Sequence, residues 1–192
     1  MGGIGPPARA WVDWLAGAGQ RLWQILPLVP VGQGGSPYNG LSAFAGNPLL
    51  VGAEGLVADG LLRRGEIDGE ESSGGGVDYS AALLGKEELL ARAFGAFRGG
   101  AAPALRAPFA AFVDANASWL ADYALFRALR EEHGGAPWSE WEAGVRLRRV
   151  DSLERAADRL AERVEFERFQ QFLFDRQWRA LREYALAREV RI

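Results

Sequence analysis

The sequence contains no cysteine and a single histidine. Without cysteine, the chain has no disulfide, no thiolate metal ligand and no cysteine nucleophile. One histidine argues against a histidine-based metal site and against a Ser-His-Asp triad. We therefore expect neither a metal nor another cofactor. His133 itself lies in "EEHGGAPW" at the end of a predicted helix, where a cation faces the negative end of the helix dipole.

Long apolar runs and an excess of basic residues are also missing. No apolar stretch approaches the roughly 20 residues that span a bilayer, and the first residues lack the basic and apolar segments of a secretory signal. The formal net charge is −3, and the arginines are interspersed with acids rather than gathered into a basic stripe. We therefore expect a cytoplasmic protein that binds neither membrane nor nucleic acid.

The chain does hold enough apolar material for one domain. It has 192 residues, of which 48% are hydrophobic and 24% charged, as in ordinary globular proteins. "GPPARAWVDWLAGAGQ" predicts a short helix, because Pro6 and Pro7 suit its first turn and Gly19 suits its C-cap. The apolar run "LWQILPL" follows closely and predicts a buried parallel strand over residues 22–26. A helix, a tight turn and a strand in this order are typical of an α/β fold.

Helical spacing of apolar residues predicts helix for most of the remainder. We expect a short helix and turn in "GAEGLVADGLLRRGEI", and longer helices over residues 86–97, 108–132 and 151 to about 188. Asp151 is the expected N-cap of the last helix, with Glu154 at its third position. Acid–arginine runs such as "DSLERAADRLAERVEFERF" indicate solvated faces with i, i+4 ion pairs.

A long glycine-rich segment, "GQGGSPYNGLSAFAGNP" at residues 32–48, follows the expected strand. Loops longer than about 12–15 residues without regular structure are usually functional or disordered, and the apolar and aromatic residues of this one favour function. In parallel α/β folds, the loops after the strands bind ligands. The glycines do not form a phosphate cradle, because no Walker lysine follows and Gly-Gly-Ser-Pro does not open a helix.

Two interpretations of Tyr38 remain open from composition alone. A tyrosine offers a flat apolar face with a polar tip, which suits stacking on a sugar ring. The same properties suit packing in a core, which is the commoner role for such a residue.

The stretch "RLWQILPLVPVGQGGSPYNGLSAFAGNPLL" closely resembles the amylomaltase, or 4-α-glucanotransferase, family (glycoside hydrolase family 77). The family motif reads approximately W-Q-V-L-P-L-x-P-T-x-x-G-x-S-P-Y-x-x-x-S-A-F-A-G-N-P. The matching residues are Trp23, Gln24, Leu26, Pro27, Leu28, Pro30, Gly34, Ser36, Pro37, Tyr38, Ser42, Ala43, Phe44, Ala45, Gly46, Asn47 and Pro48. Weaker similarity in "VDY", "WLADYALFRALREEHGGAPWSEW" and "FERFQQFLFDRQWRALREYA" extends the resemblance over almost the whole chain.

The resemblance implies an α/β fold that is mostly α in this chain: part of a (β/α)₈ barrel, with one buried parallel strand and a helix-rich insertion. Residues 1–50 would start the catalytic barrel, 51–188 would form the helical insertion, and 189–192 would begin the next strand. The implied partner is maltodextrin or another α-1,4-glucan. The implied substrate-binding residues are Ser36, Tyr38, Asn47 and Gln33, although Gln33 departs from the tyrosine often found at its position.

The activity that the resemblance implies is retaining glycosyl transfer by two carboxyl groups about 5–5.5 Å apart. In the family these groups lie beyond the segments matched here, so the resemblance assigns no catalytic residue to this chain. We therefore expect the chain to correspond to the N-terminal part of such an enzyme, and to be inactive by itself. Two alternatives stay open: a carbohydrate-binding protein without catalysis, and a helical interaction protein whose long helix binds a partner.

Overall fold

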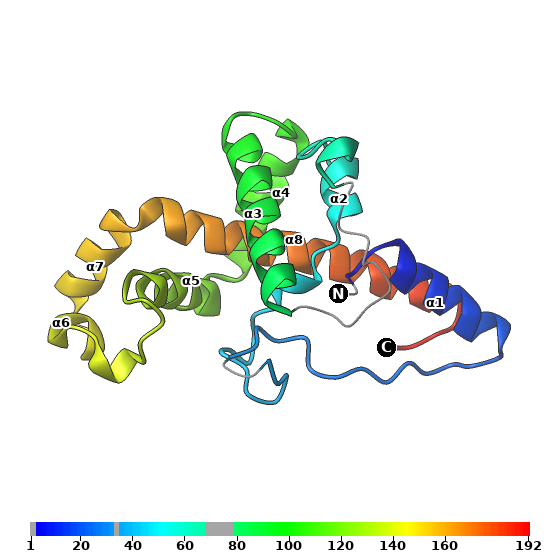
Figure 1. Ribbon diagram of the computed structural model, residues 1–192, viewed down its shortest axis with the longest axis horizontal. Coiled ribbons are helices and arrows are strands. Elements are labelled where there is room, and N and C mark those ends of the chain that lie inside the picture. The colour runs from blue at the N-terminus through cyan, green and yellow to red at the C-terminus, as the bar shows by residue number, and fades with distance from the viewer. Residues whose placement is uncertain (1–2, 33–34, 68–78) are drawn as a thin grey trace.

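The computed structural model describes residues 3–32, 35–67 and 79–192. Helices dominate this part of the chain (Figure 1). The α-helices are α1 (Pro6–Gly17), α2 (Ala53–Ala58), α3 (Tyr79–Arg98), α4 (Arg106–Ala115), α5 (Ala117–Glu132), α6 (Ala143–Arg146), α7 (Val150–Arg159) and α8 (Ala161–Leu186). Short 3₁₀ helices η1 (Pro48–Leu50), η2 (Arg64–Glu66), η3 (Pro103–Leu105) and η4 (Trp138–Glu140) lie between them.

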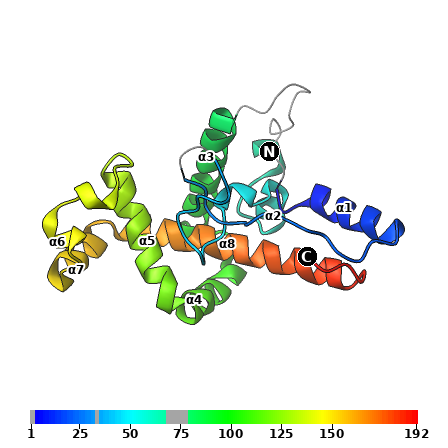
Figure 2. The ribbon, with the colours of Figure 1, turned by 90° about the horizontal axis from the view of Figure 1, so that it is seen from below.

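Helix α8 is the element around which the others are arranged. It runs along the molecule and contacts α1, α3, α4, α5, α7 and η1; α3 and α4 lie on either side of it (Figure 2). The largest buried cluster brings phenylalanines of α8 against those of α3 and α4. The rings of Phe169 and Phe97 are stacked at 4.9 Å, and those of Phe172 and Phe109 meet at 5.6 Å. Burial of this apolar face is what holds the helices together.

Helix α1 ends as its sequence predicts. Gly19 has φ +72°, and the N–H groups of Gly19 and Gln20 donate to the carbonyls of Ala16 and Leu15. This is the Schellman arrangement, for which glycine is the preferred residue. The buried face of α1, which includes Leu15, packs against the C-terminal part of α8 and against Val190.

The predicted strand at residues 22–26 is wrong. The segment is extended (the blue trace below α8 in Figure 1), and only Leu22 forms a bridge, to Arg191. Leu22 is 74% exposed and Leu26 is 55% exposed. Within the described residues, β-structure is limited to isolated bridges. Apolar β-formers make a buried strand only where neighbouring strands pair with them and cover them.

Two of the predicted helices are each interrupted. The helix expected over 108–132 is α4 and α5, separated at Asn116, whose side chain donates to the Phe112 carbonyl (2.8 Å) and accepts from the Trp119 indole (3.0 Å). Local bonds of this kind compete with the helical backbone. The helix expected from residue 151 onward is α7 and α8, separated at Leu160. The Leu160 side chain packs against two buried clusters, one that α5 shares with α8 and one that α5 shares with α7.

The predicted N-cap of the last helix is also wrong. Helix α7 begins at Val150, so Arg149 occupies the cap position. Asp151 lies one residue inside the helix, where it pairs with Arg155 at 3.0 Å. The hydrogen bond from Arg155 is the main reason that the pKa of Asp151 is held below its ordinary value. An acid in the first turn still interacts favourably with the positive end of the helix dipole. The sequence pattern therefore located the helix but not its first residue.

The exposed apolar side chains of residues 22–26 lead to a prediction. We expect the 192-residue chain to enhance the fluorescence of 8-anilinonaphthalene-1-sulfonate, because exposed apolar surface binds this dye. Replacing Leu22 and Leu26 by serine should lower the enhancement, and dynamic light scattering should show fewer aggregates. A monodisperse wild-type chain that gives no dye enhancement would contradict the prediction.

No helix in the described part of the chain is both long and apolar enough to cross a membrane.

Candidate functional site

The glycine-rich segment forms a small hairpin. The Gly32 N–H donates to the Asn39 carbonyl (3.0 Å), the Leu41 N–H donates to the Pro30 carbonyl (2.8 Å), and the Asn39 N–H closes a turn on the carbonyl of Ser36 (3.1 Å). Gly32 is required here, because a Cβ on it would lie 2.9 Å from the Asn39 carbonyl oxygen. The turn therefore presents its central residues away from the body of the protein.

Tyr38 occupies the tip of this hairpin. Its N–H donates to the Ser36 hydroxyl (3.3 Å), and its side chain is 77% exposed. Tyr38 is therefore not a core residue of this chain. The ring is free to meet a ligand, while Ser36 contributes to the turn that carries it.

Two glutamine side chains of α8 fix the following part of the loop. Gln171 of α8, which is 2% exposed, accepts from the Gly46 N–H (2.8 Å) and donates to the Gly46 carbonyl (2.9 Å). Gln177, six residues further along α8, makes the same pair of bonds to Gly52, at 2.7 and 3.1 Å. Each glutamine amide thus satisfies both backbone groups of one glycine, as a neighbouring strand would.

Gly46 also lies directly against an aromatic ring. A Cβ on Gly46 would overlap the ring carbons of Phe174, so only glycine allows the loop to approach α8 this closely. Sequence reasoning missed these anchors. The available signal was the occurrence of Gln171 and Gln177 within the apolar pattern "FQQFLFDRQW", since polar side chains on a buried helix face need hydrogen-bond partners.

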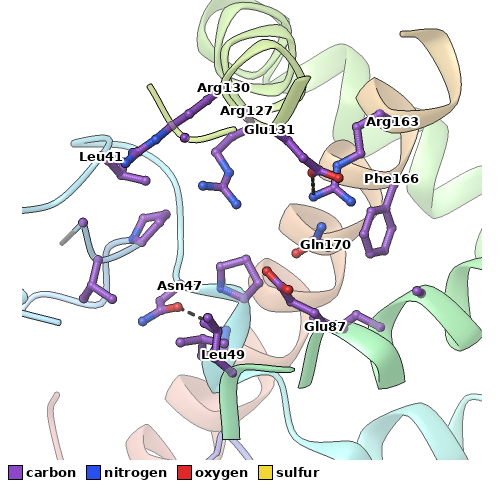
Figure 3. Close-up of a pocket in the computed structure, with 18 of the residues that line it drawn as sticks. Leu41, Asn47, Leu49, Glu87, Arg127, Arg130, Glu131, Arg163, Phe166 and Gln170 are labelled. Atoms are coloured by element: carbon purple, nitrogen blue, oxygen red, sulfur yellow. Dashed lines mark hydrogen bonds and ion pairs between the residues drawn. The ribbon is translucent and has the colours of Figure 1, made fainter. Parts of the chain in front are cut away.

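A cavity of about 700 Å³ opens between the loop and helices α3, α5 and α8 (Figure 3). Asn47 lies at its edge, where the side-chain oxygen accepts from the Leu49 N–H at 3.1 Å and caps η1. Arginines and carboxylates make up much of the remaining polar lining: Glu87, Glu88, Arg127, Arg130, Glu131 and Arg163. Guanidinium groups donate hydrogen bonds and carboxylates accept them, so the cavity suits a ligand that carries both donors and acceptors.

A buried carboxylate lies behind this cavity and organises the arginines. Glu167 of α8 is fully buried and accepts from Arg163 at 2.8 Å and from Arg127 at 3.5 Å. Arg163 also pairs with Glu131 across to α5. The result is a line of alternating charges that joins α5 to α8 and sets the direction of the guanidinium groups.

The protonation of these groups suits binding rather than acid–base chemistry. Burial is the largest single influence on the pKa of Arg127 and acts to lower it. The charges of Glu167, Tyr123 and Glu87 and the hydrogen bond to Glu167 together exceed this effect, so that the pKa is raised above its ordinary value. Burial raises the pKa of the nearby Tyr123 phenol as well. Both groups therefore keep their protons throughout the neutral range, where a general acid or base needs a pKa close to the working pH.

The structure brings together only part of the predicted substrate-binding set. Asn47 borders the large cavity, whereas Ser36 and Tyr38 lie at the hairpin tip and are not among its lining residues. Gln33 lies outside the described residues. Among the described side chains, no group of three or more histidines or carboxylates is arranged to hold a metal ion. His133 lies at the C-terminal end of α5, with Nδ1 2.8 Å from the Leu129 carbonyl oxygen.

Comparison with known proteins identifies the family. The profile described as 4-alpha-glucanotransferase matches residues 1–192. The chain belongs to the 4-alpha-glucanotransferase family. It is 44% identical to the 4-alpha-glucanotransferase of Thermus thermophilus and 40% identical to that of Synechocystis, in each case over 100% of this chain. The sequence-based assignment to this family is therefore confirmed.

The chain spans about 38% of the length of these curated relatives. A solved member of the family, the amylomaltase from Streptococcus agalactiae in complex with acarbose, superposes with a TM-score of 0.87 at 30% identity. That match covers 99% of this chain and 38% of the other. The helix-rich arrangement described above is thus that of part of an amylomaltase, and the prediction that the chain corresponds to part of such an enzyme is confirmed.

Proposed function

We propose that this chain is the part of a 4-α-glucanotransferase that holds the α-1,4-glucan, while the catalytic carboxyl groups belong to the rest of the enzyme. The reaction transfers a glucan segment between maltodextrins with retention, through a glycosyl-enzyme intermediate. The observation that carries the proposal is the family match over the whole chain. Its amylomaltase relative, which was solved with acarbose, supports a saccharide ligand.

The geometry of the hairpin tip favours the proposal that Tyr38 contacts a sugar ring. Tyr38 is exposed, its position is set by the Ser36 turn, and the loop behind it is fastened to α8 through Gly46. An aromatic ring on an anchored loop can stack on the apolar face of a glucose unit. Ser36 and Asn47 are proposed to offer hydrogen bonds to the same glucan, and Gln33 stays a prediction.

The proposed division of the chain follows the same reasoning. Residues 1–50 and 189–192 begin strands of the catalytic barrel, and residues 51–188 form a helical insertion beside the glucan. The parallel bridge between Leu22 and Arg191 supports this assignment, since it brings those two segments together. A cytoplasmic location stays a prediction, and the Arabidopsis and rice relatives are described as chloroplastic/amyloplastic.

The Tyr38→Ala substitution tests the proposed function in the complete enzyme. We expect kcat/KM for maltotriose disproportionation to fall by about tenfold, the loss that corresponds to ~60 Å² of ring contact at 25 cal/mol per Å². Because the side chain is exposed, the melting temperature should stay unchanged. Glucose release measures the rate, and differential scanning calorimetry measures the stability.

Tyr38→Phe is the matched control for this test. It keeps the ring and removes only the hydroxyl, so stacking predicts that most of the activity remains. If Tyr38→Ala retains wild-type kcat/KM, the assignment of Tyr38 to the glucan site is wrong. If the alanine variant instead unfolds, and activity falls only in proportion to folded protein, Tyr38 has a structural role.

A further inference from the structure

A second cavity, of about 330 Å³, lies at the opposite end of the insertion from α2. It is enclosed by α5, η4, α6 and α7, at the left of Figure 1, whereas the hairpin lies near the middle. Its volume is at the lower end of the ~300–1,000 Å³ that is usual for small-molecule sites. The cavity is therefore large enough for one or two sugar rings, and it is distinct from the Tyr38 hairpin.

Two tryptophans form an aromatic wall in this cavity. Trp141 is buried and held from three sides: it meets Phe126 at 5.6 Å, stacks on His133 at 5.2 Å, and donates its indole N–H to the Ala136 carbonyl at 3.1 Å. Trp138 is 59% exposed although it lines the same cavity. The cavity is thus lined by one rigid buried ring and one accessible ring, and the accessible ring of Trp138 is a suitable surface for the apolar face of a sugar.

Charged groups stand beside the aromatic wall. Arg148 Nη2 donates to both carboxylate oxygens of Asp122, at 2.9 and 2.8 Å. Since both bonds use one nitrogen, Nε and Nη1 are not used in this pair, and the carboxylate keeps further acceptor capacity. Arg148 also has φ +54°, because it ends α6 in a Schellman arrangement, with the Arg149 N–H donating to the Gly144 carbonyl at 2.9 Å. Glycine is therefore tolerated at this position.

We propose that this cavity is an accessory binding site for an α-1,4-glucan. A glucose unit stacks on Trp138, and its vicinal hydroxyls bond to the Asp122–Arg148 pair, which offers both acceptors and donors. The class of ligand rests on the proposed function, because an enzyme that elongates maltodextrins benefits from a second attachment point for its polymer. The cavity, its aromatic wall and its charged rim are all formed by residues of this chain.

Hydrogen-exchange mass spectrometry with maltotriose tests the proposal. We expect maltotriose to slow amide exchange over residues 137–149, and cellotriose at the same concentration to have a smaller effect. For Trp138→Ala, the maltotriose concentration that gives half-maximal protection should rise by about tenfold, as the loss of ~60 Å² of ring contact predicts. Arg148→Gly, which removes the guanidinium and the strained conformation, should weaken it too without lowering the melting temperature.

Trp14→Ala is the matched control. Trp14 is also 59% exposed, but it lies on α1 at the other end of the molecule (Figure 1). We expect its replacement to leave the protection of 137–149 unchanged. If Trp14→Ala and Trp138→Ala have the same effect, the protection does not arise from this cavity, and the inference is overturned.

The same measurement separates this inference from the proposed function. Protection of both 35–48 and 137–149 supports both, and protection of 137–149 alone supports the accessory site while contradicting the Tyr38 site. Protection of 35–48 alone overturns the accessory site and leaves the proposed function standing. No protection of either segment overturns both.

Discussion

Gly46→Ala is expected to lower the free energy of unfolding by about 3 kcal/mol, the upper part of the usual range for overpacking a buried site. The new Cβ would overlap the ring of Phe174, so either the ring or the loop must move. Movement of the loop would break both bonds between Gly46 and Gln171. For a chain of this size the melting temperature should fall by roughly 6–12 °C. Urea titration followed by circular dichroism measures the change.

Gly95→Ala is the matched control, and the expected sign is opposite. Gly95 lies within α3, and a Cβ on it would have no other atom within 4 Å. Alanine is the better helix former there, so stability should rise by about 0.5–1 kcal/mol. If both variants shift stability in the same direction, the close approach between the loop and α8 is not what determines the effect at Gly46.

Glu167→Gln is expected to destabilise the chain by about 3 kcal/mol. Removing one partner of a buried ion pair typically costs ~3–5 kcal/mol, because the remaining charge stays desolvated. Arg127 and Arg163 both point at the buried Glu167 carboxylate. About a quarter of each arginine side chain remains exposed, so water relieves part of the cost and the lower end of the range applies. Differential scanning calorimetry measures the loss.

Glu162→Gln is the comparison for this variant. Glu162 lies on the same helix and also pairs with an arginine, Arg98, but its side chain is 74% exposed. Exposed ion pairs contribute little to stability, so this variant should have the same melting temperature as the wild type. Adding Arg127→Met to Glu167→Gln should recover part of the lost stability, because one uncompensated charge is then removed. Equal melting of the two glutamine variants would show that Glu167 does not stabilise the charge network.

The sequence was sufficient for the features that depend on local order. Gly19 predicted the end of α1, and apolar spacing located α3, α5 and α8, because helix ends and helix faces follow from the residues nearby. The irregular segment at 32–48 was also recognised from glycine and proline alone. Its resemblance to a known motif identified the family, which the comparison confirmed.

Only the tertiary structure decided how these pieces meet. The apolar run at 22–26 has the composition of a buried strand, yet it remains mostly exposed because strand formation depends on neighbours that the local sequence does not specify. The attachment of Gly46 to Gln171 joins residues 125 positions apart. The charge line through Glu167 likewise depends on α5 and α8 packing side by side. Helical periodicity predicts which face of a helix is buried, but not which polar group of the neighbouring element contacts that face.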